Sequence, residues 1–399
     1  MSDEGGGPPV DGSPGASRPD PAPAHPAPAH PTPAGAGRPG PLSGVRVVEL
    51  GGIGPGPHGT ALLADLGCDV VTVATPAQAA AVPDRPATNP LTRGKRSVTV
   101  DLKAAGGADA VLALCDRADV LVDPFRPGVC ERLGIGPDVV CGRNERLVYA
   151  RLTGWGQDGP YADRVGHDID YLAVAGALAL LGSDPDGEPT VPLNLIADFA
   201  GGGMLLVVAV AAALVERARS GRGQVVDVAM VDGVAALVGP FYSARASGAW
   251  GPRGTNLLDG GAHFYASYRT SDDRWLAVGA IEPRFYASLL EVLGLADDPT
   301  QWDRSGWPSW KQRLADVFAS ATRDEWVARF AGTEACVAPV LDPAEVAHDP
   351  HVVARGTVVE VDGVPQPGAA PRFGRTPGSV GEAVHPGAHS LDDVLGTWS

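Results

Sequence analysis

Short β-branched runs alternate with helical segments through the first half of the chain, and this alternation limits the possible folds most strongly. The apolar runs, each predicted to be a strand, cover residues 45–50, 69–73, 97–102, 120–122, 147–152 and 224–229. Segments with helical character lie among them, at residues 60–66, 108–115 and 201–219. Parallel strands need crossover connections and are covered by helices on both faces. The pattern therefore predicts an α/β fold with a large Rossmann-like domain, in which helices flank a parallel sheet.

The pattern changes near residue 240. Two further apolar runs, 264–269 and 275–280, flank the polar spacer 270–273, which is typical of a β-hairpin. Helical segments follow at residues 284–293, 310–319 and 324–330, so a smaller α+β domain is expected. The predicted organisation is a first part of the large domain at 42–239, the small domain at 240–335, and a segment at 336–399 that returns to the large domain.

Residues 1–41 differ in composition from the rest of the chain. They hold 12 of the 38 prolines, with Ala and Gly between them. Such a segment cannot bury enough apolar surface to offset the entropy lost on ordering. We therefore predict a disordered tail that lies outside the fold.

The charge balance limits the partners of this protein. The 399 residues include 31 Lys and Arg against 47 Asp and Glu, which gives a net charge of −16. Nucleic acids and anionic membranes both bind cationic surfaces, so neither is expected as a partner. A small anionic ligand held by a few local arginines remains compatible with this balance.

The cysteines and the apolar stretches bear on location. Five cysteines occur, with no C-x-x-C pair, so neither a disulfide framework nor a zinc site is favoured. A reducing cytoplasm is the expected location.

The most apolar stretch, residues 199–215, is short for a membrane span and is flanked by charged residues, so we expect a buried core helix there.

A glycine-rich turn follows the first predicted strand. Gly54, Gly56 and Gly59 satisfy the G-x-G-x-x-G spacing of a dinucleotide site. However, Pro55 and Pro57 remove two N–H donors from the loop that would hold the pyrophosphate. The next strand also ends without the Asp or Glu that would bind the ribose hydroxyls. The turn is therefore interpreted as a tight strand-to-helix connection and not as an NAD site.

Three segments place titratable side chains where they could do chemistry. His167 would lie at the positive end of a predicted helix, which Asp168 could cap. Asp198 precedes the glycine triplet 201–203 and a strongly apolar helix, and burial there would raise its pKa and suit proton transfer. Glu282 precedes a proline that opens a helix. Helix capping alone would also explain each of these acidic residues.

Several motifs spread over the chain match one known family in combination. They are GVRVVEL at residues 44–50, GPGPH at 54–58, LADLG at 63–67, KRSVTVDL at 95–102, RPG at 126–128, TGWGQDGP at 153–160, GHDIDY at 166–171, PLNLIADFAGGG at 192–203 and GAIEPRF at 279–285. On these motifs the chain resembles the family III CoA-transferases (CaiB/BaiF-like), and more closely their α-methylacyl-CoA racemase branch. The resemblance runs from residue 41 to about the C-terminus.

The resemblance implies a large α/β domain, a small domain, and two chains that interlock as a homodimer. The active site would lie between the large domain of one chain and the small domain of the other. His167 and Asp198 would be the catalytic groups, and Glu282 would orient the histidine. No metal and no redox cofactor are expected, and CoA is part of the substrate.

Proton chemistry agrees with this implied activity. Inverting the carbon next to a thioester requires removal of its proton from one face and return from the other, so two acid/base groups are needed. The enolate oxygen needs preorganised donors, and the backbone N–H groups at Asp168 are candidates. Local cations must bind the polyanionic CoA. The candidates are Arg93, Lys95, Arg96, Arg126 and Arg132.

Some alternatives stay open. The second predicted strand ends at residues 71–76 without the arginine usual in the family, so the thioester could be carried by a protein-bound pantetheine instead of free CoA.

In a CoA-transferase, the residue equivalent to Asp198 is a nucleophile that forms acyl-anhydride and CoA-thioester intermediates. Transferases of the family typically lack a histidine at the position of His167, so the racemase is favoured. A non-catalytic CoA-binding protein is disfavoured because His167, Asp198 and Glu282 occur together. Methyl-branched fatty, sterol-side-chain and polyketide acyl groups all fit.

Overall fold

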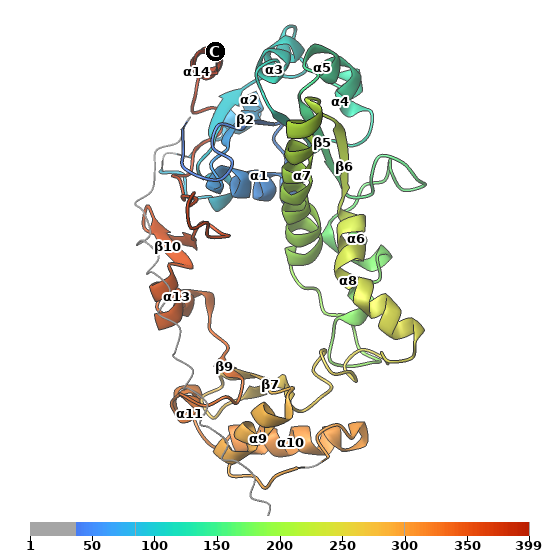
Figure 1. Cartoon of the computed structure of the whole chain (residues 1–399), viewed down its shortest axis with the longest axis vertical. Coiled ribbons are helices and arrows are strands. Elements are labelled where there is room, and N and C mark those ends of the chain that lie inside the picture. Colours follow the sequence, from blue (N-terminus) through green and yellow to red (C-terminus); the bar gives the residue numbers. More distant parts are fainter. Residues whose placement is uncertain (1–36, 84, 299, 399) are drawn as a thin grey trace, which may run out of the picture.

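The computed structural model describes residues 37–83, 85–298 and 300–398, which form a larger and a smaller body (Figure 1). Most of the predicted tail lies outside the described residues. Residues 37–41 are described, and there Arg38 is buried and its guanidinium donates to the Ser379 carbonyl. The packed part of the chain therefore includes Arg38, which lies before the predicted domain start at residue 42.

A parallel sheet in the order β3-β2-β1-β4-β5-β6 forms the centre of the larger body. Its strands are β1 (Arg46–Glu49), β2 (Asp69–Ala74), β3 (Arg96–Thr99), β4 (Val120–Asp123), β5 (Val148–Thr153) and β6 (Val225–Ala229). Each coincides within a few residues with a run predicted from the sequence. This is the strand order of a doubly wound sheet that reverses direction between β1 and β4. The predicted Rossmann-like α/β domain is confirmed.

Helices cover both faces of this sheet. α1 (Pro55–Asp65) and α7 (Leu205–Ser220) pack on one face, and α3 (Gly107–Cys115), α4 (Val129–Arg132) and α5 (Pro137–Arg143) pack on the other. The larger body also contains α2 (Pro76–Ala80), α6 (Asp168–Val174) and α8 (Met230–Ala246), with short turns η1 (Pro90–Thr92) and η2 (Leu178–Leu180). Successive strand residues point to opposite faces. Val47 accordingly packs with Leu63 of α1 and Leu206 of α7, whereas Val48 belongs to the opposite core with Leu114 of α3.

The helix predicted at residues 201–219 begins earlier and in a wider form. η3 (Leu195–Met204) is a π-helix that continues directly into α7. A Cβ on Gly203 would lie 2.4 Å from the His58 ring, and one on Gly202 would lie 2.8 Å from Pro55. The glycine triplet therefore lets α1 pack closely against the backbone of η3.

The stretch Leu195–Ser220 is long and apolar enough to cross a membrane, judged by length and composition. In its most apolar window, 33% of the residues are buried. Val208 and Val215 of α7 are exposed. The expectation of a buried core helix therefore holds for one face of α7 and not for the other.

An antiparallel sheet in the order β7-β8-β9 forms the smaller body. β7 (Tyr265–Arg269) and β8 (Trp275–Gly279) make the predicted hairpin. The helical segments are α9 (Pro283–Val292), η4 (Arg304–Gly306), α10 (Trp307–Phe318) and α11 (Arg323–Phe330), and they enclose a separate core around Phe318 and Trp326. β9 (Val337–Pro339) pairs with β8. Residues 337–339 therefore stay in the smaller body, whereas we expected the return to the large domain to begin at 336.

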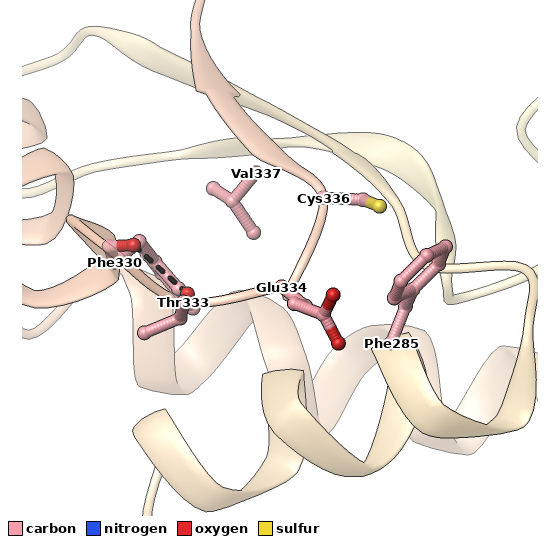
Figure 2. Close-up of a pocket in the computed structure, with 6 residues that line it drawn as sticks. All are labelled: Phe285, Phe330, Thr333, Glu334, Cys336 and Val337. Atoms are coloured by element: carbon pink, nitrogen blue, oxygen red, sulfur yellow. Dashed lines mark hydrogen bonds between the residues drawn. The ribbon is translucent and has the colours of Figure 1, made fainter. Parts of the chain in front are cut away.

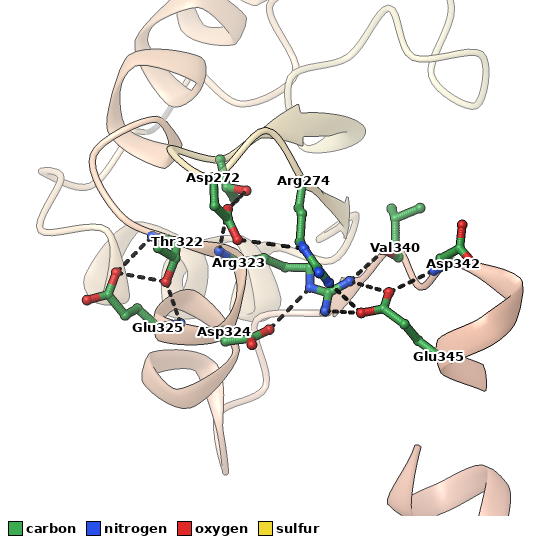
Figure 3. A network of polar contacts seen from close by, with 10 residues as sticks. Asp272, Arg274, Thr322, Arg323, Asp324, Glu325, Val340, Asp342 and Glu345 are labelled. Atoms are coloured by element: carbon green, nitrogen blue, oxygen red, sulfur yellow. Dashed lines mark hydrogen bonds and ion pairs between the residues drawn. The ribbon is translucent and has the colours of Figure 1, made fainter. Parts of the chain in front are cut away.

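A polar network fastens the chain where it leaves the smaller body (Figure 3). The two terminal guanidinium nitrogens of Arg323 each donate to Glu345 of α12 (Pro343–Val346) at 2.8 Å, and Arg274 also donates to this carboxylate. These bonds hold the pKa of Glu345 well below its usual range, and Arg323 is the main cause. The smaller body thus extends to α12.

The chain then returns to the larger body on the side of the molecule opposite α8 (Figure 1). The return contains α13 (Pro350–Arg355), the hairpin of β10 (Val358–Val361) and β11 (Val364–Pro367), and α14 (Leu391–Thr397). After α14, the Trp398 indole N–H donates to Asp69 at 2.7 Å, and the Arg96 guanidinium lies 5.5 Å from the ring centroid. The last described residue therefore packs against β2 and β3 of the central sheet.

Candidate active site

The candidate site lies at the carboxyl ends of the central strands. The turn after β1 carries Gly54, the turn after β4 carries Arg126, and the loop after β5 leads to His167. A Cβ on Gly52 would lie 3.2 Å from Pro124, so the turns after β1 and β4 are in contact. Doubly wound sheets bind their ligands at this edge, where the strand order reverses.

Asp168 joins the two predicted catalytic groups. His167 is the N-cap residue of α6, and Asp198 lies in the first turn of η3. The Asp168 carboxylate accepts the backbone N–H of Ala197 at 2.9 Å and that of Asp198 at 2.8 Å. The expectation that Asp168 caps its own helix is wrong, because its side chain caps η3. The N–H of His167 instead donates to Asp170 at 2.9 Å.

The environment of Asp198 favours the protonated carboxyl. Burial is the main cause that raises its pKa, and the charge of Asp168 raises it further. A hydrogen bond from Asn194 at 3.2 Å and the charge of His167 act in the opposite direction. The predicted direction of the pKa shift is confirmed. A carboxyl with a raised pKa exchanges its proton closer to neutral pH.

The glycine-rich turn approaches Asp198 closely. Gly54 has a φ of +65°, and a Cβ there would lie 2.7 Å from Asp198 Oδ2. Glycine is needed on both counts, because other residues rarely adopt this φ and would strike the carboxylate. The turn is therefore part of the wall of the site.

His58 is a neighbour of the site that the sequence analysis did not single out. Its ring stacks on Phe199, the residue after Asp198, with ring centroids 4.5 Å apart. Burial, followed by the charges of Arg93 and Lys95, lowers the pKa of His58. A neutral imidazole therefore packs against η3 beside the site. The GPGPH motif marked the position but not this contact.

Most of the predicted CoA-binding cations lie in the interior, so the prediction is corrected for them. The buried ion pairs are Arg93–Asp65 at 2.5 Å, Lys95–Glu49 at 2.8 Å and Arg96–Asp69 at 2.6 Å. Because their charges are neutralised inside the protein, these three side chains are not available to a ligand. Arg126 and Arg132 are exposed beyond the carboxyl end of β4 and remain candidates.

Glu282 lies in the smaller body, where it is the exposed N-cap residue of α9. A pocket of about 340 Å³ adjoins it, lined by Phe285, Phe330, Thr333, Glu334, Cys336 and Val337. Figure 2 shows the Glu334 carboxylate and the Cys336 thiol pointing toward the Phe285 ring. Burial, and then the charges of Glu282 and Glu334, raise the pKa of Cys336. α9 and α6 lie in different bodies (Figure 1), so one chain does not bring Glu282 to His167.

Proton transfer is the chemistry that these side chains offer. His167 and Asp198 can each accept or donate a proton, and the N–H groups that open α6 are available to a developing negative charge. Within 37–83, 85–298 and 300–398, no group of three or more His, Cys, Asp or Glu side chains is placed to hold a metal ion.

Known proteins resemble this chain over most of its length. Residues 42–390 match CoA-transferase family III. The α-methylacyl-CoA racemases of Mus musculus and Homo sapiens are each 46% identical to it; both alignments cover 84% of this chain, with 87% of the mouse and 90% of the human protein. The crystal structure of a CaiB/BaiF family protein from Brucella suis superposes with a TM-score of 0.78 at 27% identity. That match covers 91% of this chain and 100% of the other.

Proposed function

Because this chain belongs to CoA-transferase family III, as the match over residues 42–390 shows, we propose that it is a racemase of 2-methylacyl-CoA thioesters. The relatives that are 46% identical to it are racemases, which are isomerases. The observation that carries the proposal is that Asp168, the residue after His167, accepts the Asp198 N–H at 2.8 Å, while the charge of His167 acts on the Asp198 carboxyl. A transferase that uses only an aspartate nucleophile has no need of this histidine.

In the proposed reaction, the carbon next to the thioester carbonyl loses its proton to one group and regains one from the other. His167 and Asp198 serve on opposite faces of this carbon. Each acts as the base in one direction of the racemisation and as the acid in the other. The raised pKa of Asp198 supports this role, since the group must hold a proton in one half of the cycle. The N–H groups that open α6 would bind the enolate oxygen.

Two further parts of the proposal concern the substrate and a second copy of the chain. Arg126 and Arg132 would bind the anionic CoA moiety, because they are exposed at the edge where the site lies. Glu282 would come from the second chain of an interlocked homodimer and orient His167. The support is the separation of α9 from α6 within one chain (Figure 1).

The test is proton exchange in heavy water. One epimer of 2-methyldecanoyl-CoA is incubated with the enzyme in D₂O without any acceptor acid, and α-deuterium and the epimer ratio are followed by NMR. We expect deuterium at the α-carbon together with inversion. A parallel reaction with the matching pantetheine thioester shows whether the nucleotide part of CoA is required.

The alternative is a CoA-transferase, for which Asp198 is the favourable observation. A transferase would need a second carboxylic acid, would form an adduct at Asp198 that hydroxylamine traps, and would leave the α-hydrogen in place. Acceptor-dependent CoA exchange without α-deuterium would overturn the racemase proposal.

A further inference from the structure

We propose that Asp168 is a positioning residue whose carboxylate fixes the first turn of η3, and with it Asp198, relative to His167 on α6. The roles of His167 and Asp198 in this statement rest on the proposed function. The role assigned here belongs to the Asp168 side chain, and it is separate from that of the backbone N–H groups that open α6.

The hydrogen bonds of η3 explain why its first turn needs an external acceptor. The first i→i+5 bond runs from Phe199 N–H to the Asn194 carbonyl at 3.3 Å. The N–H groups of Ala197 and Asp198 precede it, and such N-terminal donors have no partner within their own helix. Asp168 Oδ2 accepts both, at 2.9 and 2.8 Å.

The contact is a direct link between the two candidate catalytic groups. Asp168 follows His167 in the chain and is 7% exposed, so it has little freedom to move. The backbone of Asp198 is thereby held to the residue next to His167, across 30 positions of sequence. A change in this carboxylate should therefore alter the separation of His167 and Asp198, and not the binding of CoA.

The charge of Asp168 also acts on Asp198. Its second oxygen, Oδ1, is buried and has no hydrogen-bond partner in the described part of the chain. Three groups from the α6 segment face Asp198, namely His167, Asp168 and Tyr171. Asn194 faces it from the start of η3, and Gly54 from the turn after β1. The neutral His58 ring of α1 stacks on the next residue, Phe199. Among them, Asp168 contributes the negative charge that raises the pKa of Asp198.

Two substitutions separate the two effects. Asp168→Asn keeps an oxygen acceptor of the same shape but removes the charge, so kcat should change less than about tenfold, and the acidic limb of the pH–kcat profile should move to lower pH. Asp168→Ala removes the acceptor as well, and kcat should fall by about 100-fold, the effect that a displacement near 1 Å can have. KM should stay close to that of the wild type in both variants.

A matched control tests whether loss of any helix cap would do the same. The Asp349 carboxylate also accepts two successive N–H groups, from His351 at 3.0 Å and Val352 at 2.9 Å, at the start of α13. Asp349→Ala should reduce thermal stability but leave the pH profile unchanged. An equal change of profile in Asp349→Ala would overturn the proposal.

A second measurement does not depend on activity. Amide hydrogen exchange of residues 194–199 should accelerate in Asp168→Ala, remain close to wild type in Asp168→Asn, and remain unchanged in Asp349→Ala. Unchanged protection of the Ala197 and Asp198 amides in Asp168→Ala would refute the contact. Failure of the proposed function would give a different result. The wild-type protein would exchange no α-proton of the thioester, although the amide protection of residues 194–199 would still be lost in Asp168→Ala. If Asp168→Ala does not fold, Asp168→Ser, whose shorter side chain withdraws the acceptor from the two N–H groups, takes its place in both measurements.

Discussion

Lys95 and Glu49 form an almost completely buried ion pair beneath the glycine-rich turn, with 2.8 Å between Nζ and Oε2 and each side chain 1% exposed. Lys95 also donates to the Pro57 carbonyl at 3.0 Å and contacts the Thr60 hydroxyl at 2.7 Å. The pair therefore ties β1 to the first turn of α1, whose N-cap residue Gly54 lies against Asp198.

Replacing one member of this pair should be strongly destabilising. Lys95→Met leaves the Glu49 carboxylate buried without a counter-charge, and we expect the free energy of unfolding to fall by about 3–5 kcal/mol. Urea denaturation measures the loss. The double variant Lys95→Met/Glu49→Gln should recover part of it. Arg143→Met, which breaks the exposed pair with Asp116, is the comparison and should have only a small effect. Equal losses in Lys95→Met and Arg143→Met would contradict the importance of burial.

Gly54→Ala should impair the site more than it impairs the fold. The new Cβ would lie 2.7 Å from Asp198 Oδ2, so the carboxylate must move. We expect kcat for α-proton exchange to fall by about 100-fold, as displaced catalytic groups can cause. Gly106→Ala is the control, since Gly106 also has a positive φ (+80°) but has nothing within 4 Å of its Cβ position. Comparable activity in the two variants would argue against contact of the turn with Asp198.

Asp198→Asn should lower activity and raise stability at neutral pH. A raised folded-state pKa means that the folded protein holds the proton more tightly than the unfolded chain, so this carboxyl costs stability as the pH rises through its folded-state pKa. The amide carries no such cost, and the melting temperature of the variant should exceed that of the wild type at pH 7 but not at pH 3. Racemisation should fall by about 10²–10⁴-fold, because the base is lost. Calorimetry at the two pH values tests the sign.

Mixed dimers test whether the site is shared between chains. If Glu282 of one chain orients His167 of the other, a heterodimer of His167→Ala and Glu282→Ala chains contains one intact site. Mixing equal amounts of the two weakly active variants and refolding them should restore activity toward about a quarter of the wild type, because random pairing makes half of the dimers mixed and each mixed dimer has one intact site of two. Refolding each variant alone provides the baseline. Absence of recovery, with heterodimers confirmed by mass, would exclude Glu282 from the partner's site.

The exposed arginines should determine the affinity for CoA thioesters. Arg126→Ala should raise KM by about tenfold or more, because a hydrogen bond to a charged group is lost, while kcat changes little. Arg219→Ala, at the exposed end of α7, gives a comparison with the same change in net charge. A similar rise in KM for both variants would indicate only a general electrostatic effect.

The strands could be predicted from the sequence because each is a short β-branched run bounded by turn residues. α8 was not predicted, and the predicted domain boundary between residues 239 and 240 falls inside it, because the helix continues through Pro240 to Ala246. Likewise, the sequence does not show that Arg93, Lys95 and Arg96 are buried, because their partner carboxylates lie 27 to 46 positions away.

The candidate site shows the same limit. The motifs identified His167 and Asp198, and His167 lies at the start of a helix as expected. Asp198 was expected before a helix that begins at residue 201, but it lies inside η3, which begins at Leu195. The bond from Asp198 N–H to Asp168, and the stacking of His58 on Phe199, depend on how separate elements pack. Neither contact has a local sequence signal.

The packing of Trp398 against Asp69 has a consequence for how the protein is made. These residues are 329 positions apart, and the smaller body lies between them in the chain. A ribosome must therefore synthesise the smaller body in full before the larger one can close its last contact. Long-range contacts of this kind slow folding, and partly folded multidomain chains expose apolar surface that aggregates. The nascent larger body should consequently depend on chaperones until translation reaches Trp398, and late premature termination should yield aggregated protein instead of a smaller active enzyme.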